Sequence, residues 1–192
     1  MNLPGFIGSV LPFVKPRDLK NQLNEQFRSK HEDLSRGLTL SKIRSVKREL
    51  LSLAQETDCE LSTIACAYVY FEKLVLANVV NKPNRKLMAA VCLVLAAKWN
   101  ESGATADLLT LLERQYAIPR AVIFGSEFSV YVELSFQLCL EPHEVYPHFL
   151  RLLQVLERTP QEYLGVLYYA EYTDSITDTG KFCRGRRDAS WV

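Results

Sequence analysis

Several features that mark common protein classes are missing from this sequence of 192 residues. Its 23 lysines and arginines nearly balance its 22 aspartates and glutamates, and the formal net charge is +1. Domains that bind nucleic acid over much of their surface are usually strongly basic, so this balance argues against that class. No apolar run approaches the roughly 20 residues that a membrane-spanning helix needs. The sequence therefore predicts neither a membrane span nor a dominant nucleic-acid surface.

The signatures of a catalytic or metal site are also missing. There are three histidines, and two of them, His143 and His148, are five residues apart across Pro147. Two histidines that bind one zinc ion from the same helix face are four apart. We find no glycine-rich phosphate loop and no nucleophile elbow. We therefore expect no catalytic residue, no cofactor and no metal, and a protein that acts by presenting a surface.

Cysteine is present but scattered. The five cysteines form no closely spaced pair of the kind that holds a metal, and Cys66 and Cys92 lie in apolar stretches. In such stretches cysteine behaves as a small hydrophobic residue. An odd, scattered set favours reduced thiols, and hence a location in the cytoplasm and nucleus.

The strongest positive signal is an apolar stretch near the middle of the chain. From Leu87 to Ala97 every residue is apolar or small, and most are good helix formers. A helix that is apolar all round must be enclosed by other elements. This stretch rises only about 16 Å, roughly half the hydrocarbon core of a bilayer. We therefore predict a buried central helix over residues 84–100, with Lys98 near its C-terminal end.

Amphipathic helices are predicted before and after this central helix, with Ser41, Ser62 or Thr63, and Asn84 as N-caps. The segment 126–138 partly alternates, so a strand stays open there, although the helical surroundings favour a helix. The predicted fold class is all-α, a bundle around the central helix. The other predicted helices cover residues 18–31, 39–55, 62–81, 106–116, 141–156 and 159–172, and another helical segment is predicted to begin at Pro119.

The composition divides the chain into four segments. Residues 1–17 mix prolines and glycines with apolar residues and are predicted to be an irregular N-terminal arm. Residues 18–158 form the folded domain, and residues 159–172 form a C-terminal helical extension. From residue 173 the chain turns polar, so residues 173–192 are predicted to be a disordered basic tail.

The helix predicted over residues 39–55 carries a cluster of cations, Lys42, Arg44, Lys47 and Arg48. A solvated helix face is one explanation of such a cluster. A patch that attracts an acidic partner is the other, and both stay open.

Several segments resemble known proteins. Three of them resemble the cyclin box, and two more resemble the Cables family of cyclin-box adaptor proteins, over roughly residues 20 to 158 in all. The cyclin-like segments are AYVYFEKL (67–74), LVLAAKWNE (93–101) and Glu127 followed by LSFQL (134–138). The Cables-like segments are NEQFRSKH (24–31) and LTLSKIRSVKRE (38–49).

The resemblance implies a single cyclin box that binds a cyclin-dependent kinase, with an Abl-type tyrosine kinase as a further partner. By position, Lys98 and Glu127 match the lysine and glutamate with which cyclins contact a kinase. Lysine only donates hydrogen bonds and a carboxylate only accepts them, so the two can hold opposite backbone groups beside an apolar groove. From the residues alone, an ordinary salt bridge within the domain explains them as well.

We therefore expect a non-enzymatic adaptor or regulator that influences cell-cycle progression. The alternative is a cyclin-fold module of a transcription or nucleic-acid-binding complex. Its motivating features are the cations from Lys42 to Arg48 and the basic tail.

Overall fold

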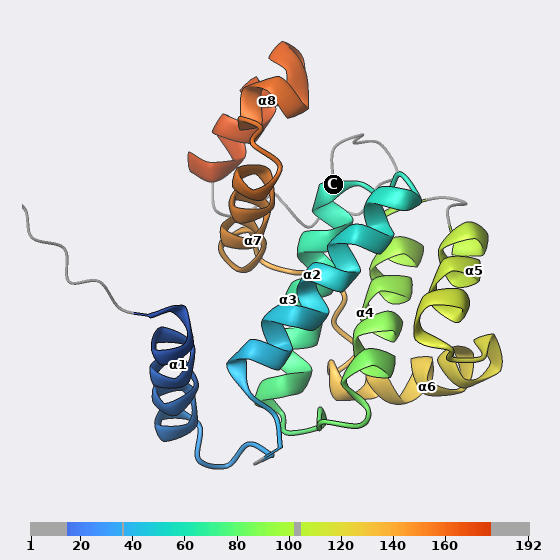
Figure 1. Cartoon of the computed structure of the whole chain (residues 1–192). Coiled ribbons are helices and arrows are strands. Elements are labelled where there is room, and N and C mark those ends of the chain that lie inside the picture. The colour runs from blue at the N-terminus through green and yellow to red at the C-terminus, as the bar shows by residue number, and fades with distance from the viewer. Residues whose placement is uncertain (1–14, 36, 102–104, 178–192) are drawn as a thin grey trace, which may run out of the picture.

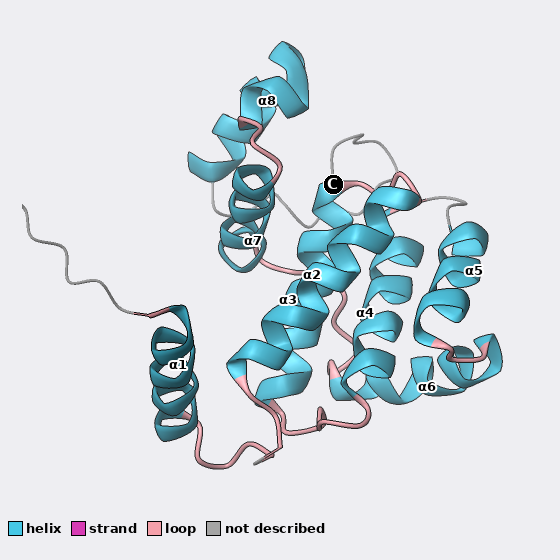
Figure 2. Cartoon of the chain, viewed as in Figure 1, coloured by secondary structure: helices cyan, strands magenta, loops and turns pink. Residues whose placement is uncertain are grey.

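The computed structural model describes residues 15–35, 37–101 and 105–177. All regular structure in these ranges is helical (Figure 2), so the predicted all-α class is confirmed. The stretch 126–138 is no strand: a helix covers its first part and a turn follows. The helices are α1 (Pro16–Lys30), α2 (Leu40–Glu56), α3 (Leu61–Leu76), α4 (Arg85–Asn100), α5 (Thr105–Tyr116), α6 (Arg120–Glu133), α7 (Pro142–Val155) and α8 (Pro160–Thr177).

The apolar stretch in the middle of the chain forms α4, the predicted central helix. Every residue from Ala89 to Ala97 is buried, and α4 contacts α2, α3, α5 and α6 (Figure 1). A helix without a polar face is stable in water only inside such a layer of neighbours. Leu87, which the sequence placed in the core, is partly buried and packs at its edge.

Two other helices show the range of burial in this fold. Most of α3 is buried between α4 and α7. In contrast, α1 has no buried residue and lies against α2. The Asn24 side-chain oxygen accepts hydrogen bonds from the backbone N–H and the hydroxyl of Ser41, both at 3.0 Å, and so joins α1 to the start of α2.

The helix caps differ from the predicted ones. The N-cap of α2 is Thr39, whose hydroxyl accepts a hydrogen bond from the Lys42 N–H at 3.4 Å, and Ser41 lies in the first turn. Glu60 precedes α3, while Ser62 and Thr63 are buried inside the helix.

Asn84 precedes α4 as predicted, but its side chain makes no cap hydrogen bond. The Asn84 side-chain oxygen accepts a hydrogen bond from the Asn81 N–H at 2.7 Å, and its side-chain nitrogen donates one to the Val79 carbonyl at 3.0 Å. Asn84 therefore stabilises the turn before the helix instead.

The boundaries of the terminal segments also differ. Helix α1 begins at Pro16, earlier than predicted, because proline suits the first helical turn, where its missing N–H has no partner to lose. Helix α8 continues to Thr177, so residues 173–177 are helical and are not part of a disordered tail. Its backbone is interrupted at Gly165, where φ is 71°. Residues 1–14 and 178–192, the rest of the predicted arm and tail, lie outside the described residues.

The cysteines only partly match the expectation of reduced thiols. Cys59, Cys66 and Cys92 are buried free thiols, and burial raises the pKa of the Cys66 thiol to about 11. Cys139, in contrast, is disulfide-bonded, so the expectation fails at this residue. The three buried thiols are packing residues with little thiolate at neutral pH.

Candidate functional site

The structure brings Lys98 and Glu127 together on the surface. Lys98 lies in the last turn of α4, and Glu127 lies in the middle of α6. The Lys98 Nζ atom is 2.6 Å from Oε1 and 2.7 Å from Oε2 of Glu127. The Lys98 side chain is 41% exposed and the Glu127 side chain is 18% exposed. The pair is therefore a salt bridge at the rim of the domain, open to solvent on the lysine side.

The sequence of α6 explains why Glu127 reaches α4. Ile123 and Val130 are the buried residues of this helix, and Glu127 lies between them on the same face. That face packs on α4, so the Glu127 carboxylate lies beside Lys98 at the C-terminal end of α4. A cation in the last turn also interacts favourably with the negative end of the helix dipole.

Exposed aromatic side chains surround the ion pair. Trp99 is 47% exposed, Phe124 46%, Phe128 70% and Phe136 55%. The Lys98 Nζ atom lies 5.1 Å from the centre of the Phe124 ring, within cation–π distance. A groove of about 400 Å³ opens here, lined by Leu95, Lys98, Trp99, Phe124, Glu127, Phe128, Tyr131 and Leu138. Exposed apolar patches rimmed by charge are typical of protein-binding surfaces.

A tight turn after α6 forms one side of this aromatic surface. Ser135 and Phe136 have φ values of 55° and 59°. The Phe136 N–H donates to the Tyr131 carbonyl at 3.0 Å and the Ser135 N–H to the Val132 carbonyl at 2.8 Å. This is the Schellman arrangement that ends many helices. It turns the Phe136 ring back onto α6, where its centre is 5.1 Å from that of Tyr131 and 6.5 Å from that of Phe128.

The resemblance to cyclins singled out Lys98 and Glu127, with a salt bridge between them as the alternative to kinase contact, but it did not point to the aromatic surface beside them. Phe124, Phe128 and Tyr131 follow helical spacing and form a second apolar stripe on α6, beside the buried stripe of Ile123 and Val130. A surface helix normally has one such stripe and an opposite polar face. This second stripe is the sequence signal for an exposed apolar surface. It can be recognised only when residues 126–138 are taken as helical, and their alternating pattern leaves a strand open.

A second charged cluster joins three helices on another part of the domain. Glu72 of α3 forms an ion pair with Lys47 of α2, and its Oε2 atom is 3.1 Å from Nε2 of His148 on α7. Burial raises the pKa of Glu72, but the His148 hydrogen bond and the Lys47 charge outweigh burial and lower the pKa to about 2. No sequence pattern predicts this cluster, because Lys47 and His148 lie 25 and 76 residues from Glu72 along the chain. It fixes α7 against α2 and α3.

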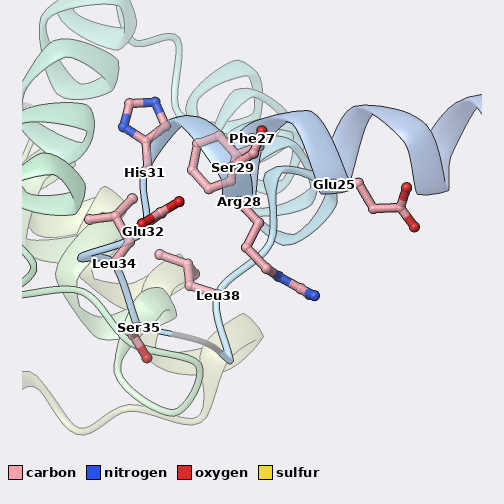
Figure 3. A pocket seen from close by; sticks show the side chains of 9 residues that line it. All are labelled: Glu25, Phe27, Arg28, Ser29, His31, Glu32, Leu34, Ser35 and Leu38. Carbon is pink, nitrogen blue, oxygen red and sulfur yellow. The ribbon is translucent and has the colours of Figure 1, made fainter.

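A further hollow of about 670 Å³ lies beside the end of α1 (Figure 3). Phe27, Leu34 and Leu38 line it, and Glu25 and Arg28 extend away from them. Its polar groups do not converge on one point, so it has no features of a catalytic site.

The part of the chain that the structure describes contains neither a metal-binding cluster nor a membrane-spanning helix. No group of three or more His, Cys, Asp or Glu residues there is placed to hold a metal ion. None of the helices there is both long enough and apolar enough to cross a bilayer.

Comparison with known proteins identifies relatives of the chain. Residues 15–139 match the family model described as "Cyclin, N-terminal domain". The chain is 45% identical over 159 residues to the mouse (Mus musculus) protein "CDK5 and ABL1 enzyme substrate 1", a match that covers 80% of this chain and 28% of that protein. It is 46% identical over 153 residues to the human (Homo sapiens) protein "CDK5 and ABL1 enzyme substrate 2", covering 78% of this chain and 31% of that protein. The matched part thus spans less than a third of each of these relatives. No solved structure matches the chain.

Proposed function

Because the chain belongs to the cyclin N-terminal domain family, and within it to the CDK5 and ABL1 enzyme substrate (Cables) group, we propose that it binds a cyclin-dependent kinase. In this proposal it is a regulatory adaptor, without catalytic activity of its own, that influences cell-cycle progression in the cytoplasm and nucleus. The observation that carries the proposal is the Lys98–Glu127 pair at the edge of an exposed aromatic groove.

The aromatic groove supplies the apolar part of the interface. Phe128, which lines the groove, and Phe136, which packs on Phe128, each expose more than half of their surface to solvent, so a partner that covers them gains apolar burial. A helix laid into an apolar groove is a common way for one protein to hold another. The αC-helix of a kinase is the proposed occupant, because its position controls the ion pair that a kinase needs for phosphoryl transfer.

The ion pair supplies the polar part of the interface. A bound kinase can offer a backbone carbonyl to Lys98 and a backbone N–H to Glu127. Separating the two side chains costs little, since a pair that is 41% exposed on one side contributes about 0–1 kcal/mol. The pair is therefore well suited to exchange its internal contact for contacts with a partner.

An Abl-type tyrosine kinase is proposed as a second partner, because the relatives carry ABL1 in their names. Tyr68 and Tyr70 are poor substrates for it, because only 7% and 0% of their surfaces are exposed. Their hydroxyls donate to the carbonyls of Lys47 and Leu138. Modification of either would require the domain to open.

The test is a binding titration of the double variant Lys98→Ala, Glu127→Ala against a purified cyclin-dependent kinase, beginning with CDK5. We expect the dissociation constant to rise about tenfold or more, as for loss of a central polar pair in an interface. Far-ultraviolet circular dichroism should stay unchanged, because the pair contributes little to folding.

A matched control is the ion pair that joins the start of α6 to α5. Arg120 at the start of α6 pairs with Glu113 at 3.1 Å, and both side chains are similarly exposed, at 43% and 46%. The variant Arg120→Ala, Glu113→Ala should bind the kinase like the unaltered chain. Equal binding by all three proteins would refute the assigned role of Lys98 and Glu127.

A further inference from the structure

A groove rich in cations is lined by residues of α1, α2, α3, α4 and α7. It has a volume of about 790 Å³, and seven lysines and arginines line it against two carboxylates, Glu49 and Glu72. The whole chain has a net charge of only +1, so this excess is local. The cations are Lys20, Lys42, Arg44, Lys47, Arg48, Arg85 and Arg151.

The two carboxylates already have partners. Glu72 is bound to Lys47 and His148, and the Glu49 Oε2 atom is 3.0 Å from the Nζ atom of Lys86, a residue outside the groove. Arg44, Arg48 and Arg151 are exposed, and none of the described carboxylates lies within ion-pair distance of them. The groove therefore keeps an excess of positive charge.

These cations act on one another across the groove. Burial lowers the pKa of Lys47, Glu72 raises it, and the charge of Arg151 from α7 lowers it again. Burial likewise lowers the pKa of Lys42, and Lys82 and Arg85 lower it further. Negative charge placed between α2 and α7 would relieve this repulsion.

The arrangement suits an extended ligand better than a single small anion. Arg44, Lys47 and Arg48 follow the spacing of one helix face on α2, while Lys20 comes from α1 and Arg151 from α7. The charges are thus spread along the groove. Val155 at its border is 61% exposed and offers an apolar contact.

Nucleic acid fits this surface less well. Single-stranded nucleic acids stack their bases on exposed aromatic rings, but Tyr68, which lines this groove, is only 7% exposed.

From these observations we propose that the groove between α1, α2 and α7 docks an acidic segment, rich in aspartate and glutamate, of a partner protein. Figure 1 shows α1 and α7 on one side of the α3–α4 pair and α5 and α6 on the other. The groove is therefore separate from the Lys98–Glu127 surface, and both can be occupied together. The proposal does not depend on kinase binding.

The test uses the full chain and a short fluorescent peptide of aspartate, glutamate and an occasional leucine, followed by fluorescence anisotropy. A peptide with asparagine and glutamine in place of the acids is the ligand control. We expect the acidic peptide to bind and the neutral one not to bind. The variant Arg44→Gln, Arg48→Gln, Arg151→Gln should raise the dissociation constant of the acidic peptide about tenfold or more.

The control variant Arg28→Gln, Arg114→Gln, Arg158→Gln removes the same charge from exposed positions outside the groove. Its dissociation constant should stay within about twofold of the unaltered chain, since distant surface charges are screened by salt. Three results would overturn the proposal. These are equal weakening by both variants, no binding of the acidic peptide by the unaltered chain, and tighter binding of a short DNA duplex that the Arg44, Arg48, Arg151 variant abolishes.

Discussion

Replacing Glu72 by glutamine tests how the cluster of Glu72, Lys47 and His148 holds the helices together. The change removes one negative charge and keeps the size of the side chain. It leaves Lys47, whose side chain is only 13% exposed, without its carboxylate partner. The expected result is a chain that folds but is less stable at neutral pH.

The pKa of Glu72 gives the magnitude. The fall of the Glu72 pKa from the ordinary value of 4.5 to about 2 corresponds to a contribution of about 3 kcal/mol to the free energy of unfolding, before any screening by solvent. Because 45% of the Glu72 side chain is exposed, water screens the interaction, and we reduce this to ~1 kcal/mol. Leaving the largely buried Lys47 unpaired adds to the loss, so we expect about 1–3 kcal/mol at pH 7.

The pH dependence follows from the sign of the pKa change. Since folding lowers the pKa of Glu72, the charged carboxylate stabilises the fold above about pH 4.5, and this contribution disappears as the pH falls through about 2. Urea denaturation of the unaltered chain and of Glu72→Gln should therefore differ at pH 7 and converge near pH 2. Glu113→Gln removes an equal charge from the exposed pair with Arg120 and serves as control. A Glu72→Gln deficit that is constant with pH would refute the reasoning.

Three further changes test the core, the turn after α6 and the aromatic surface. Leu93→Ala removes a fully buried side chain of α4 and should cost about 2–5 kcal/mol in urea denaturation; a loss below about 1 kcal/mol would contradict its place in the core. Ser135→Gly relieves the strain of a left-handed backbone, with φ of 55°, and should raise the free energy of unfolding by about 0.5–1 kcal/mol. A lower free energy of unfolding would contradict the left-handed conformation at this residue. Phe128→Ala should change stability by less than about 0.5 kcal/mol, because the ring is 70% exposed, yet weaken kinase binding by more than about 1 kcal/mol in calorimetry; unchanged binding would remove the ring from the interface.

The centre of the fold could be predicted because its signal is local. Residues 87–97 contain no polar side chain, and an uninterrupted apolar run of helix formers has few alternatives to a buried helix. The positions of Lys98 and Glu127 came from the resemblance to cyclins, and the structure places their charged atoms within 2.7 Å. Periodicity alone could not have paired them.

Other features depend on contacts that the sequence does not display. The turn at Ser135 has a serine where such turns usually have glycine, so the end of α6 carried no recognisable stop signal. Asn84 looked like a helix cap, but its side chain bonds to Asn81 and Val79 because the preceding turn folds back onto it. The Glu72 cluster requires α7 to return to α3, which is a property of the tertiary fold.

Hydrogen–deuterium exchange of the chain with and without a cyclin-dependent kinase tests the central claim, that the surface formed by α4 and α6 holds the kinase. The proposal predicts slower exchange at the end of α4, in α6 and in the turn at residues 134–138, with α1 unchanged. Protection confined to α1 and α2, or no protection of α6 in a complex that has demonstrably formed, would contradict it.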